Sequence, residues 1–273
     1  MGYECKVETD SISPDGIRLT TMVVTFPRIV LAEFNTHRVF SRNSASSRAI
    51  PVEKQLRRVL RDPFIPVSFG VNRSGMQATE ELTGWRLKLG RLIWLLGSKA
   101  AVALAWILLK VGVHKQITNR VLEPFMWHTV VVTATEWENF FALRTHKDAQ
   151  PEIQVIARMM KDAYDKSNPT PLHYEEWHLP FVNQLEKQTV GVDWPMVSAA
   201  RCARVSYLTH DGKRDLDADL KLAKRLQSSG HMSPFEHAAT PDAFANGMED
   251  FTGNFRCWVQ LRKMLPNERI YKP

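Results

Sequence analysis

A continuous apolar run extends from Leu92 to Val113, with the sequence LIWLLGSKAAVALAWILLKVGV. A run of this length has to bury its side chains in a protein core or in lipid. Lys99 lies well inside it, and a charge at the middle of a membrane span is costly. We therefore expect a buried or amphipathic helix and no membrane partner, with peripheral membrane contact as the lesser alternative.

The rest of the chain alternates strand-like and helix-like segments. Residues 17–26 and 126–135 are rich in β-branched residues and predict strands. Helical spacing occurs in RIVLAEFNTHRVF, EWENFFALR, EIQVIARMMKDAY, DLDADLKLAKRLQSSGH (with a C-cap at Gly230) and FRCWVQLRKML. Overlapping T-x-x-E patterns from Thr133 and Thr135 predict capping boxes for EWENFFALR, and residues 167–194 read as an ordered loop. Without an internal repeat or linker, we expect one domain over residues 1–273.

The composition is that of a basic globular protein, with a formal net charge of +7 and a pI near 9.4. Such a balance favours anionic partners, and because the basic residues are scattered, small phosphorylated ligands fit at least as well as nucleic acid. Cys5, Cys202 and Cys257 are odd in number and widely spaced, which supports neither a disulfide framework nor a metal site. The N-terminus lacks a signal-peptide pattern. We expect a cytoplasmic protein, in the host cytoplasm if it is phage-encoded.

Polar residues are concentrated between Thr36 and Arg48, in the sequence THRVFSRNSASSR. Serine hydroxyls, loop amides and guanidinium groups are donors that hold a phosphate. A solvated, serine-rich loop explains the same composition equally well. The glycine-rich phosphate loop of other nucleotide sites is absent.

Arg144 shares one helical face with Trp137, Phe140 and Phe141, at the spacing i, i+3, i+4 and i+7. A guanidinium on an aromatic face needs a partner or a place at the edge of the core. A structural ion pair or snorkelling is the commoner explanation. The functional alternative is an arginine aimed into a ring-lined pocket.

The segment HMSPFEH, from His231 to His237, combines two histidines with a glutamate. Ser233, Pro234 and Glu236 are typical of a helix N-terminus with a capping box. The spacing matches no zinc-protease motif, so we expect no metal.

Together these segments resemble the flavin-dependent thymidylate synthase family. The motif R-H-R, seven residues, then S-x-R is similar to Thr36-His37-Arg38, Ser46 and Arg48 here. Four further elements are similar to family motifs: N-R-V-L-E-P at Arg120, N-F-F-A-L-R ending at Arg144 with A-Q-x-E-I after it, the A-R-V-S strand at 203–206, and G-H-x-S-P-F-E-H at 230–237.

The order of these elements differs from the usual family arrangement, in which the A-R-V-S and F-E-H elements precede R-H-R. The chain resembles permuted members carried by bacteriophages. We predict that its C-terminal elements pack beside its N-terminal ones. At Thr36, Ser44, Thr133, Thr135 and Asp148 the sequence departs from the family pattern, mainly on the flavin side.

The resemblance implies an α+β fold, with a mixed sheet flanked by helices, and the synthesis of dTMP from dUMP. The one-carbon donor is methylenetetrahydrofolate, FAD is the cofactor, and NADPH is the reductant. Arg144 is the implied catalytic residue, polarising the uracil without an enzymic nucleophile. The implied nucleotide-binding residues are Glu33, Ser46, Ser47, Arg48, Arg120 and Arg144. The implied flavin-binding residues are His37, Arg38, Asn43, Asn139, Ser206, His231, Ser233 and Glu236.

Family members are homotetramers whose sites combine several subunits, so these residues need not converge within one chain. One alternative keeps the site and changes the product, to hydroxymethylated dUMP or dCMP. An alternative of another class is a basic, non-catalytic nucleic-acid-binding protein. The primary hypothesis has no nucleic-acid partner.

Overall fold

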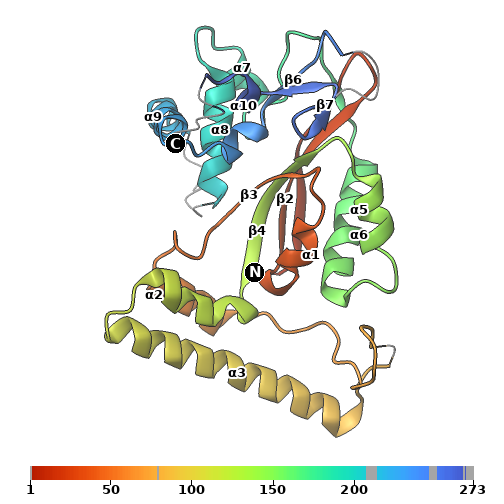
Figure 1. Ribbon diagram of the computed structural model, residues 1–273, viewed down its shortest axis with the longest axis vertical. Helices are drawn as coiled ribbons and strands as arrows, with labels where there is room; N and C mark the ends of the chain where they lie inside the picture. The colour runs from red at the N-terminus through yellow and green to blue at the C-terminus, as the bar shows by residue number, and fades with distance from the viewer. Residues whose placement is uncertain (1, 79, 207–213, 246–250, 267, 269–273) are drawn as a thin grey trace, which may run out of the picture.

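A five-stranded mixed sheet forms the centre of the molecule (Figure 1). The computed structural model describes residues 2–78, 80–206, 214–245, 251–266 and 268, with the backbone alone at Ser206 and Phe251. The strand order is β3-β4-β2-β1-β5, with β1 and β5 parallel and the other pairs antiparallel. The strands are β1 (Glu4–Ile12), β2 (Arg18–Pro27), β3 (Ser41–Ser44), β4 (Trp127–Ala134) and β5 (Thr170–Pro171). The α+β expectation is confirmed, and β2 and β4 are the two strands predicted from the sequence.

Alternate residues of β2 and β4 point to opposite faces of the sheet, as the pleat requires. Val24 and Val130 belong to the core on one face, whereas Val23 and Val131 pack with Cys202 on the other. Both faces are therefore covered, which explains why these strands are almost continuously apolar or β-branched.

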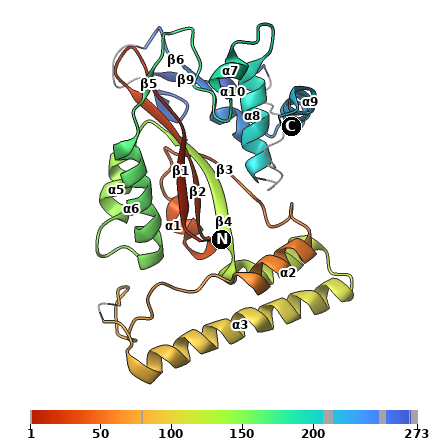
Figure 2. The ribbon, with the colours of Figure 1, turned by 180° about the vertical axis from the view of Figure 1, so that it is seen from behind.

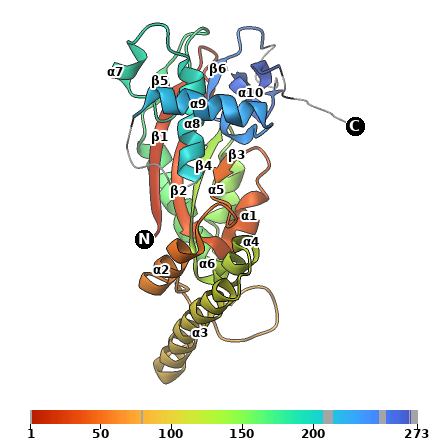
Figure 3. The same cartoon turned by 90° about the vertical axis from the view of Figure 1, so that its left-hand side faces the viewer.

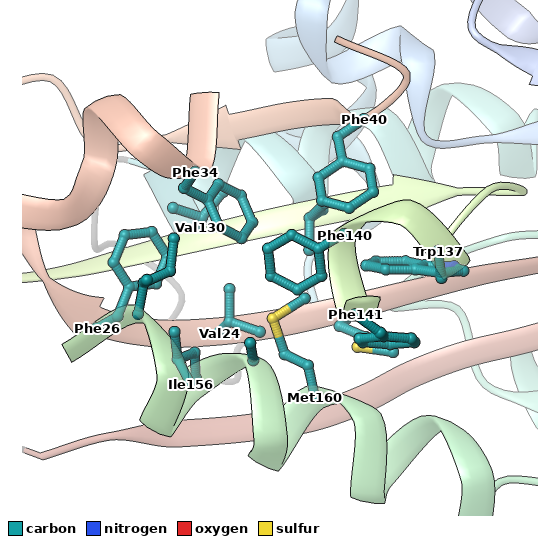
Figure 4. Packing of buried hydrophobic residues seen from close by; sticks show 14 of the residues in the cluster. Val24, Phe26, Phe34, Phe40, Val130, Trp137, Phe140, Phe141, Ile156 and Met160 are labelled. Carbon is teal, nitrogen blue, oxygen red and sulfur yellow. The ribbon is translucent and has the colours of Figure 1, made fainter. Parts of the chain in front are cut away.

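Two helices, α5 (Glu138–Arg144) and α6 (Pro151–Lys166), cover the first face (Figures 1 and 2). They enclose a core that is unusually rich in aromatic rings, because Trp137, Phe140 and Phe141 meet Phe34 of α1 (Leu31–Asn35) and Phe40 (Figure 4). The ring centroids of Phe34 and Phe140 are 5.6 Å apart in an edge-to-face arrangement. The aromatic face predicted for α5 is thus a core face.

The other face and one end of the sheet carry the C-terminal elements. Helix α8 (Trp194–Ser206) lies against β4, and α9 (Leu216–Ser228) packs on α8. The smaller elements around them are α7 (Gln184–Lys187), η3 (Ser233–Glu236), β6 (Ala239–Pro241), β7 (Phe251–Thr252), β8 (Phe255–Arg256), β9 (Trp258–Gln260) and α10 (Leu261–Met264).

The C-terminal elements pack beside the N-terminal ones, as the permuted motif order predicts. The Asn43 side chain of β3 donates a hydrogen bond to the carbonyl of Cys202 in α8, at 3.0 Å. The Gln260 amide of β9 donates to the Ser41 hydroxyl at 2.9 Å. These bonds join residues more than 150 positions apart, so spatial proximity replaces the usual sequence order.

A helical layer at the far end contains α2 (Val52–Arg61), α3 (Gly84–Lys110), α4 (Lys115–Thr118) and the 3-10 helix η2 (Asn119–Phe125) (Figure 3). The sequence correctly predicts a helix over the apolar run. The expectation that this helix is buried is wrong, because only Ser98, Ala101 and Ala105 of its 27 residues are buried and large apolar side chains are exposed along it.

Several local predictions are also wrong. The segment RIVLAEFNTHRVF forms only the turn η1 (Arg28–Val30) and the short helix α1, and FRCWVQLRKML forms two strands and a single helical turn. The A-R-V-S element lies at the end of helix α8, not in a strand.

The ordered segment 167–194 contains β5 and α7. Gly230 has the positive φ, 73°, expected of a residue that follows a helix C-terminus.

The two predicted capping boxes are absent. Helix α5 begins after Trp137, which makes no side-chain cap hydrogen bond. The Thr133 hydroxyl instead lies within hydrogen-bond distance of the Thr21 hydroxyl (2.7 Å) and His237 Nδ1 (2.8 Å). Thr135 accepts a hydrogen bond from the backbone amide of Arg256. Tertiary partners from the C-terminal part have replaced the local caps.

Candidate functional site

A cavity of about 440 Å³ opens where the loop after β3 meets α4, α8, α9 and η3. It collects residues from segments far apart in the sequence, and its volume suits a small phosphorylated ligand. Its lining consists of Asn43, Ser44, Ser46, Arg48, Ala49, His114, Gln116, Ala203, Leu226, His231, Ser233 and Pro234.

One wall is the serine-rich loop that follows β3. The Ser46 carbonyl accepts the Ala49 amide at 2.9 Å, which forms a tight turn. The buried Asn119 side chain donates to the carbonyls of Ser47 and Ile50, at 2.7 and 2.9 Å, and fixes the base of the loop. Ser46 and Arg48 remain exposed at the cavity. A hydroxyl and a guanidinium so placed can both donate to a phosphate.

The opposite wall comes from the segment that follows α9. His231 and Ser233 are exposed, and the Ser233 hydroxyl donates to Asn43 Oδ1 at 3.3 Å. His231 Nδ1 lies 2.9 Å from the Ser229 hydroxyl. Asn43 therefore connects the β3 side of the cavity to η3 through its oxygen and to α8 through its nitrogen.

His114 and Gln116 line the same cavity, and sequence reasoning missed them. His114 is the N-cap of α4, where its Nδ1 accepts from the Gln116 amide at 3.3 Å. In the sequence they are two polar residues that directly follow the apolar run. No spacing relates them to Ser46, so only the packing of α4 against the loop could have revealed them.

Arg144 lies in a second group, apart from the cavity lining. Its Nε donates to His37 Nε2 at 2.9 Å, and its Nη2 donates to the Thr36 hydroxyl at 2.8 Å and the Glu33 carbonyl at 3.2 Å. The loop after α1 thus holds the guanidinium at the edge of the aromatic core. The side-chain oxygen Oε2 of Glu33 is buried, and no hydrogen-bond partner for it occurs in the described part of the chain.

His37 is neutral in this arrangement. Burial, and then the charges of Arg144 and Arg42, lower its pKa from 6.5 to about 4. Because Nε2 accepts from Arg144, the ring proton resides on Nδ1. The ring packs on Phe40 and Phe140, with centroid distances of 5.6 and 5.0 Å. A neutral acceptor orients Arg144 and leaves its positive charge uncompensated by His37.

A third group surrounds the Glu123 carboxylate of η2. Ser47 donates its hydroxyl to Glu123, while Arg120 and Arg28 lie 2.9 and 3.0 Å from the same oxygen. The Arg120 side chain is 52% exposed, which leaves part of it accessible to a ligand. Ser47 itself is buried, and its hydroxyl is directed toward the protein.

The remaining residues predicted from the resemblance do not converge with these groups. Arg38 and Asn139 are exposed on the surface, and Glu236 forms an ion pair with Arg262. Ser206 ends α8, but its side chain lies outside the described residues. One chain therefore brings together Asn43, Ser46, Arg48, His231 and Ser233 around the cavity, and holds Glu33, His37 and Arg144 elsewhere.

The cysteines have the character of packed apolar residues. Cys202 and Cys257 are buried and Cys5 is partly buried. Burial raises the pKa of Cys5 from 9.0 to about 12 and that of Cys202 still further. Their thiols therefore stay protonated near neutral pH, which does not suit a nucleophile.

Comparison with known proteins identifies the family. The model of the thymidylate synthase complementing protein family matches residues 17–170, more than half of the chain. The chain belongs to this family. The match contains Arg48, Arg120 and Arg144, whereas His231 and Ser233 lie beyond its end.

Solved structures show the same fold. The UMP/dUMP methylase PolB from Streptomyces cacaoi, bound with 5-Br UMP, is 16% identical at a TM-score of 0.50, covering 60% of this chain and 89% of PolB. PolB bound with 5-Br dUMP is 20% identical at a TM-score of 0.46, covering 56% and 69% of the two chains. No curated protein sequence matches this chain.

The residues fit FAD only in part. Asn43, His231 and Ser233 face one cavity and provide amide, imidazole and hydroxyl groups that can bind a polar portion of a flavin nucleotide. Arg38 and Asn139 are exposed elsewhere on the surface of this chain. The described part of one chain therefore does not gather all of these residues in the cavity.

Proposed function

We propose that this chain synthesises dTMP, by transferring a one-carbon unit from methylenetetrahydrofolate to C5 of dUMP with reduced FAD and with NADPH as the reductant. Family membership supports C5 methylation of a pyrimidine nucleotide at the general level. The observation that carries the proposal is the cavity that unites Ser46 and Arg48 with His231 and Ser233. These four polar residues come from two motifs that are far apart in the sequence, and packing of the fold does not require that they line one cavity.

In this proposal Ser46 and Arg48 bind the nucleotide phosphate. Both are exposed at the cavity, and the Asn119 side chain anchors the backbone of their loop. A guanidinium can make two parallel hydrogen bonds to a phosphate, which fixes orientation as well as affinity. We also assign Arg120 to nucleotide binding, since its side chain is 52% exposed although it is ion-paired with Glu123.

Arg144 polarises the uracil and stabilises negative charge that develops on the ring. A preorganised cation at the place where charge develops is an effective stabiliser. His37 orients the guanidinium by accepting the hydrogen bond from its Nε, and the backbone carbonyl of Glu33 accepts from Nη2. Because Arg144 does not line the cavity of its own chain, we assign it to a site completed by another copy in a homotetramer.

When bound, reduced FAD supplies the hydride chemistry, and the chain supplies binding groups, orientation and positive charge. Asn43, His231 and Ser233 are the residues we assign to it on the cavity side. We place the enzyme in the cytoplasm, in line with the wide spacing of its three cysteines in the sequence.

Product mass tests the proposal. Purified protein incubated with dUMP, methylenetetrahydrofolate, FAD and NADPH should yield dTMP, whereas dCMP should be unchanged. Absorbance of the purified protein should show an oxidised flavin that bleaches on reduction. Arg144→Ala should abolish turnover, and Arg48→Ala should remove most of it at a dUMP concentration below the original KM, while both proteins stay folded. Arg158→Ala, at an exposed arginine of α6, should remain active. Full activity in either site variant would contradict the assignment.

Hydroxymethylation of dUMP or dCMP remains the second candidate. The hydroxyls of Thr133 and Thr135, at positions where the family pattern has flavin contacts, are bonded within the chain instead. A changed flavin environment can alter the last reductive step. A product heavier than dTMP by one oxygen atom from dUMP, or one heavier than dCMP by CH2O from dCMP, would establish this activity in place of methylation.

A further inference from the structure

One long side of helix α3 is uncovered at the end of the molecule (Figures 1 and 3). Its buried residues, Ser98, Ala101 and Ala105, lie on the side that faces α2 and η2. At 1.5 Å per residue, the 27-residue helix is about 40 Å long. A flat partner could therefore approach the opposite side along the whole helix.

The uncovered side is a continuous apolar stripe. Most of its members recur at intervals of three, four or eight residues, which places them on one face of α3, and Val111 directly follows the helix. We call the following set the apolar stripe, with exposed fractions in parentheses: Trp85 (71%), Leu89 (44%), Leu92 (52%), Ile93 (59%), Leu96 (54%), Leu104 (55%), Ile107 (49%) and Val111 (69%). Soluble monomers rarely expose so long an apolar surface unless a partner covers it.

A row of lysines borders this stripe. Lys88, Lys99 and Lys110 are exposed and follow one another at intervals of eleven residues. Eleven residues make about three helical turns, so the three side chains project from the same side of α3. Asp and Glu are absent from the whole segment between Glu81 and Glu123. Every charged side chain of α3 is therefore cationic, and most of its other side chains are apolar.

We propose that α3 binds an anionic lipid bilayer, lying in the plane of the membrane surface. The apolar stripe enters the boundary between headgroups and acyl chains, and the lysine row reaches the lipid phosphates. This differs from the sequence-based expectation of no membrane partner. It is independent of the proposed enzymatic function.

Charge and packing favour binding at the surface of an anionic bilayer over two alternatives, contact with a second copy of the chain and a helix that spans the membrane. A second copy of the chain also carries a net charge of +7, whereas an anionic bilayer complements the acid-free helix. Helix α3 is long and apolar enough to cross a membrane. A spanning orientation would, however, remove Ala101 and Ala105 from the cluster that they form with Leu56 and Leu122.

Vesicle flotation of the full chain tests the proposal. The protein should float with vesicles of phosphatidylcholine mixed with phosphatidylglycerol and bind vesicles of phosphatidylcholine alone at least about tenfold more weakly. Binding should fall as salt is raised, because salt screens the lysine contribution. An alkaline carbonate wash should release the protein, since it binds the surface without spanning the bilayer.

Two sets of variants separate the contributions. Ile93→Gln combined with Leu96→Gln should reduce the floating fraction on mixed vesicles about tenfold or more. The control Leu185→Gln removes a leucine of α7 that is even more exposed, at 76%, and should bind as the original chain does. Lys88→Gln combined with Lys99→Gln should lower binding to the anionic vesicles and leave the weak binding to phosphatidylcholine unchanged.

Three outcomes would overturn the proposal. The first is absence of flotation together with an assembly, measured by sedimentation, that loses mass in the Ile93→Gln, Leu96→Gln variant, because another copy would then cover the stripe. The second is resistance to the carbonate wash, which would indicate a spanning helix. The third is equal flotation of the stripe variant and the original chain.

Discussion

At the residue scale, the most informative contact is that between Arg144 and His37. An arginine at the end of an aromatic helix face could have remained in solvent or met a carboxylate. It meets a neutral imidazole, a hydroxyl and a carbonyl, all of which orient it without neutralising it. This is the arrangement that a binding or catalytic cation requires, because a carboxylate partner would reduce its field.

His37 should accordingly act as a positioning residue for Arg144. We expect His37→Ala to lower kcat about 10- to 100-fold in the proposed reaction, with a smaller change in KM. His37→Gln, whose amide oxygen can accept from Arg144, should recover part of the loss. A merely structural role for His37 predicts a fall in protein stability with normal kcat in the folded fraction, which steady-state kinetics and thermal unfolding would distinguish.

Arg48 belongs to the same scale but controls binding. Removing a charged hydrogen bond to phosphate costs about 1.5–3 kcal/mol, so Arg48→Ala should weaken dUMP binding about 10- to 100-fold. Titration calorimetry with dUMP measures the change. Deoxyuridine, which lacks the phosphate, serves as the control ligand and should bind both proteins equally. A loss that is the same for both ligands would place the phosphate elsewhere.

At the scale of elements, buried charges join α8 to α9. Arg201 is 2% exposed and lies 2.9 Å from Asp219 of α9 and 2.9 Å from Glu186 of α7. Asp219, fully buried, also accepts from Arg204 at 2.7 Å. Desolvated charges persist only when each has its partners, so this cluster sets the position of α9 on α8. That position matters because Ala203 and Leu226 line the cavity.

Breaking this cluster should be costly. We expect Asp219→Ala to lower the free energy of unfolding by about 3–5 kcal/mol, because it leaves the buried Arg201 incompletely paired. The matched control Asp217→Ala, an exposed aspartate two residues earlier on α9, should cost less than about 1 kcal/mol. Urea denaturation measures both. Equal effects would show that the charges contribute little to the packing of α9.

At the scale of the whole molecule, a buried polar chain links both ends of the sequence through the sheet. His178 lies 2.9 Å from the Ser11 hydroxyl and 2.8 Å from the Thr21 hydroxyl. Thr21 meets Thr133, which in turn lies 2.8 Å from His237. Strands β1, β2 and β4 are thereby tied to two segments of the C-terminal half. Each member is nearly or fully inaccessible to solvent.

We expect three buried histidines to make the stability of the folded chain sensitive to acid. Burial lowers the pKa of His178, His237 and His128 from 6.5 to about 3 in the folded chain. The unfolded chain therefore binds protons first, and stability should fall as pH decreases from about 6.5 toward about 3. Below pH 6.5 each histidine contributes a loss on the order of 1 kcal/mol per pH unit. These groups cause no change above neutrality.

Urea denaturation at pH 7.5 and at pH 5.5 would measure this dependence. The variant His237→Gln should have a shallower dependence on pH, even if it is less stable at neutral pH. A stability that is constant between the two pH values would show that these histidines are not neutral in the fold. The same series reports whether the chain unfolds in one transition, as we expect for a single domain.

The local sequence predicted those elements whose stability comes from local patterns. The β-branched runs became β2 and β4, and the amphipathic segments became α5, α6 and α9. Predictions at positions with a tertiary partner were wrong. The Thr133 hydroxyl bonds to His237 and does not cap α5, and the residues around Trp258 form a strand because β6 pairs with them. The A-R-V-S segment is helical because α8 has both the sheet and α9 to pack against.

For the candidate site, the sequence by itself determined which residue types carry the chemistry, and their motifs identified the family despite the altered order. Only the tertiary structure decided which of them share a space. It placed Ser46 and Arg48 opposite His231 and Ser233, added His114 and Gln116, and kept Arg144 apart with His37. It also decided that the apolar run is exposed. The physical reason is the same in each case, because burial and proximity depend on how distant segments pack and not on spacing within a segment.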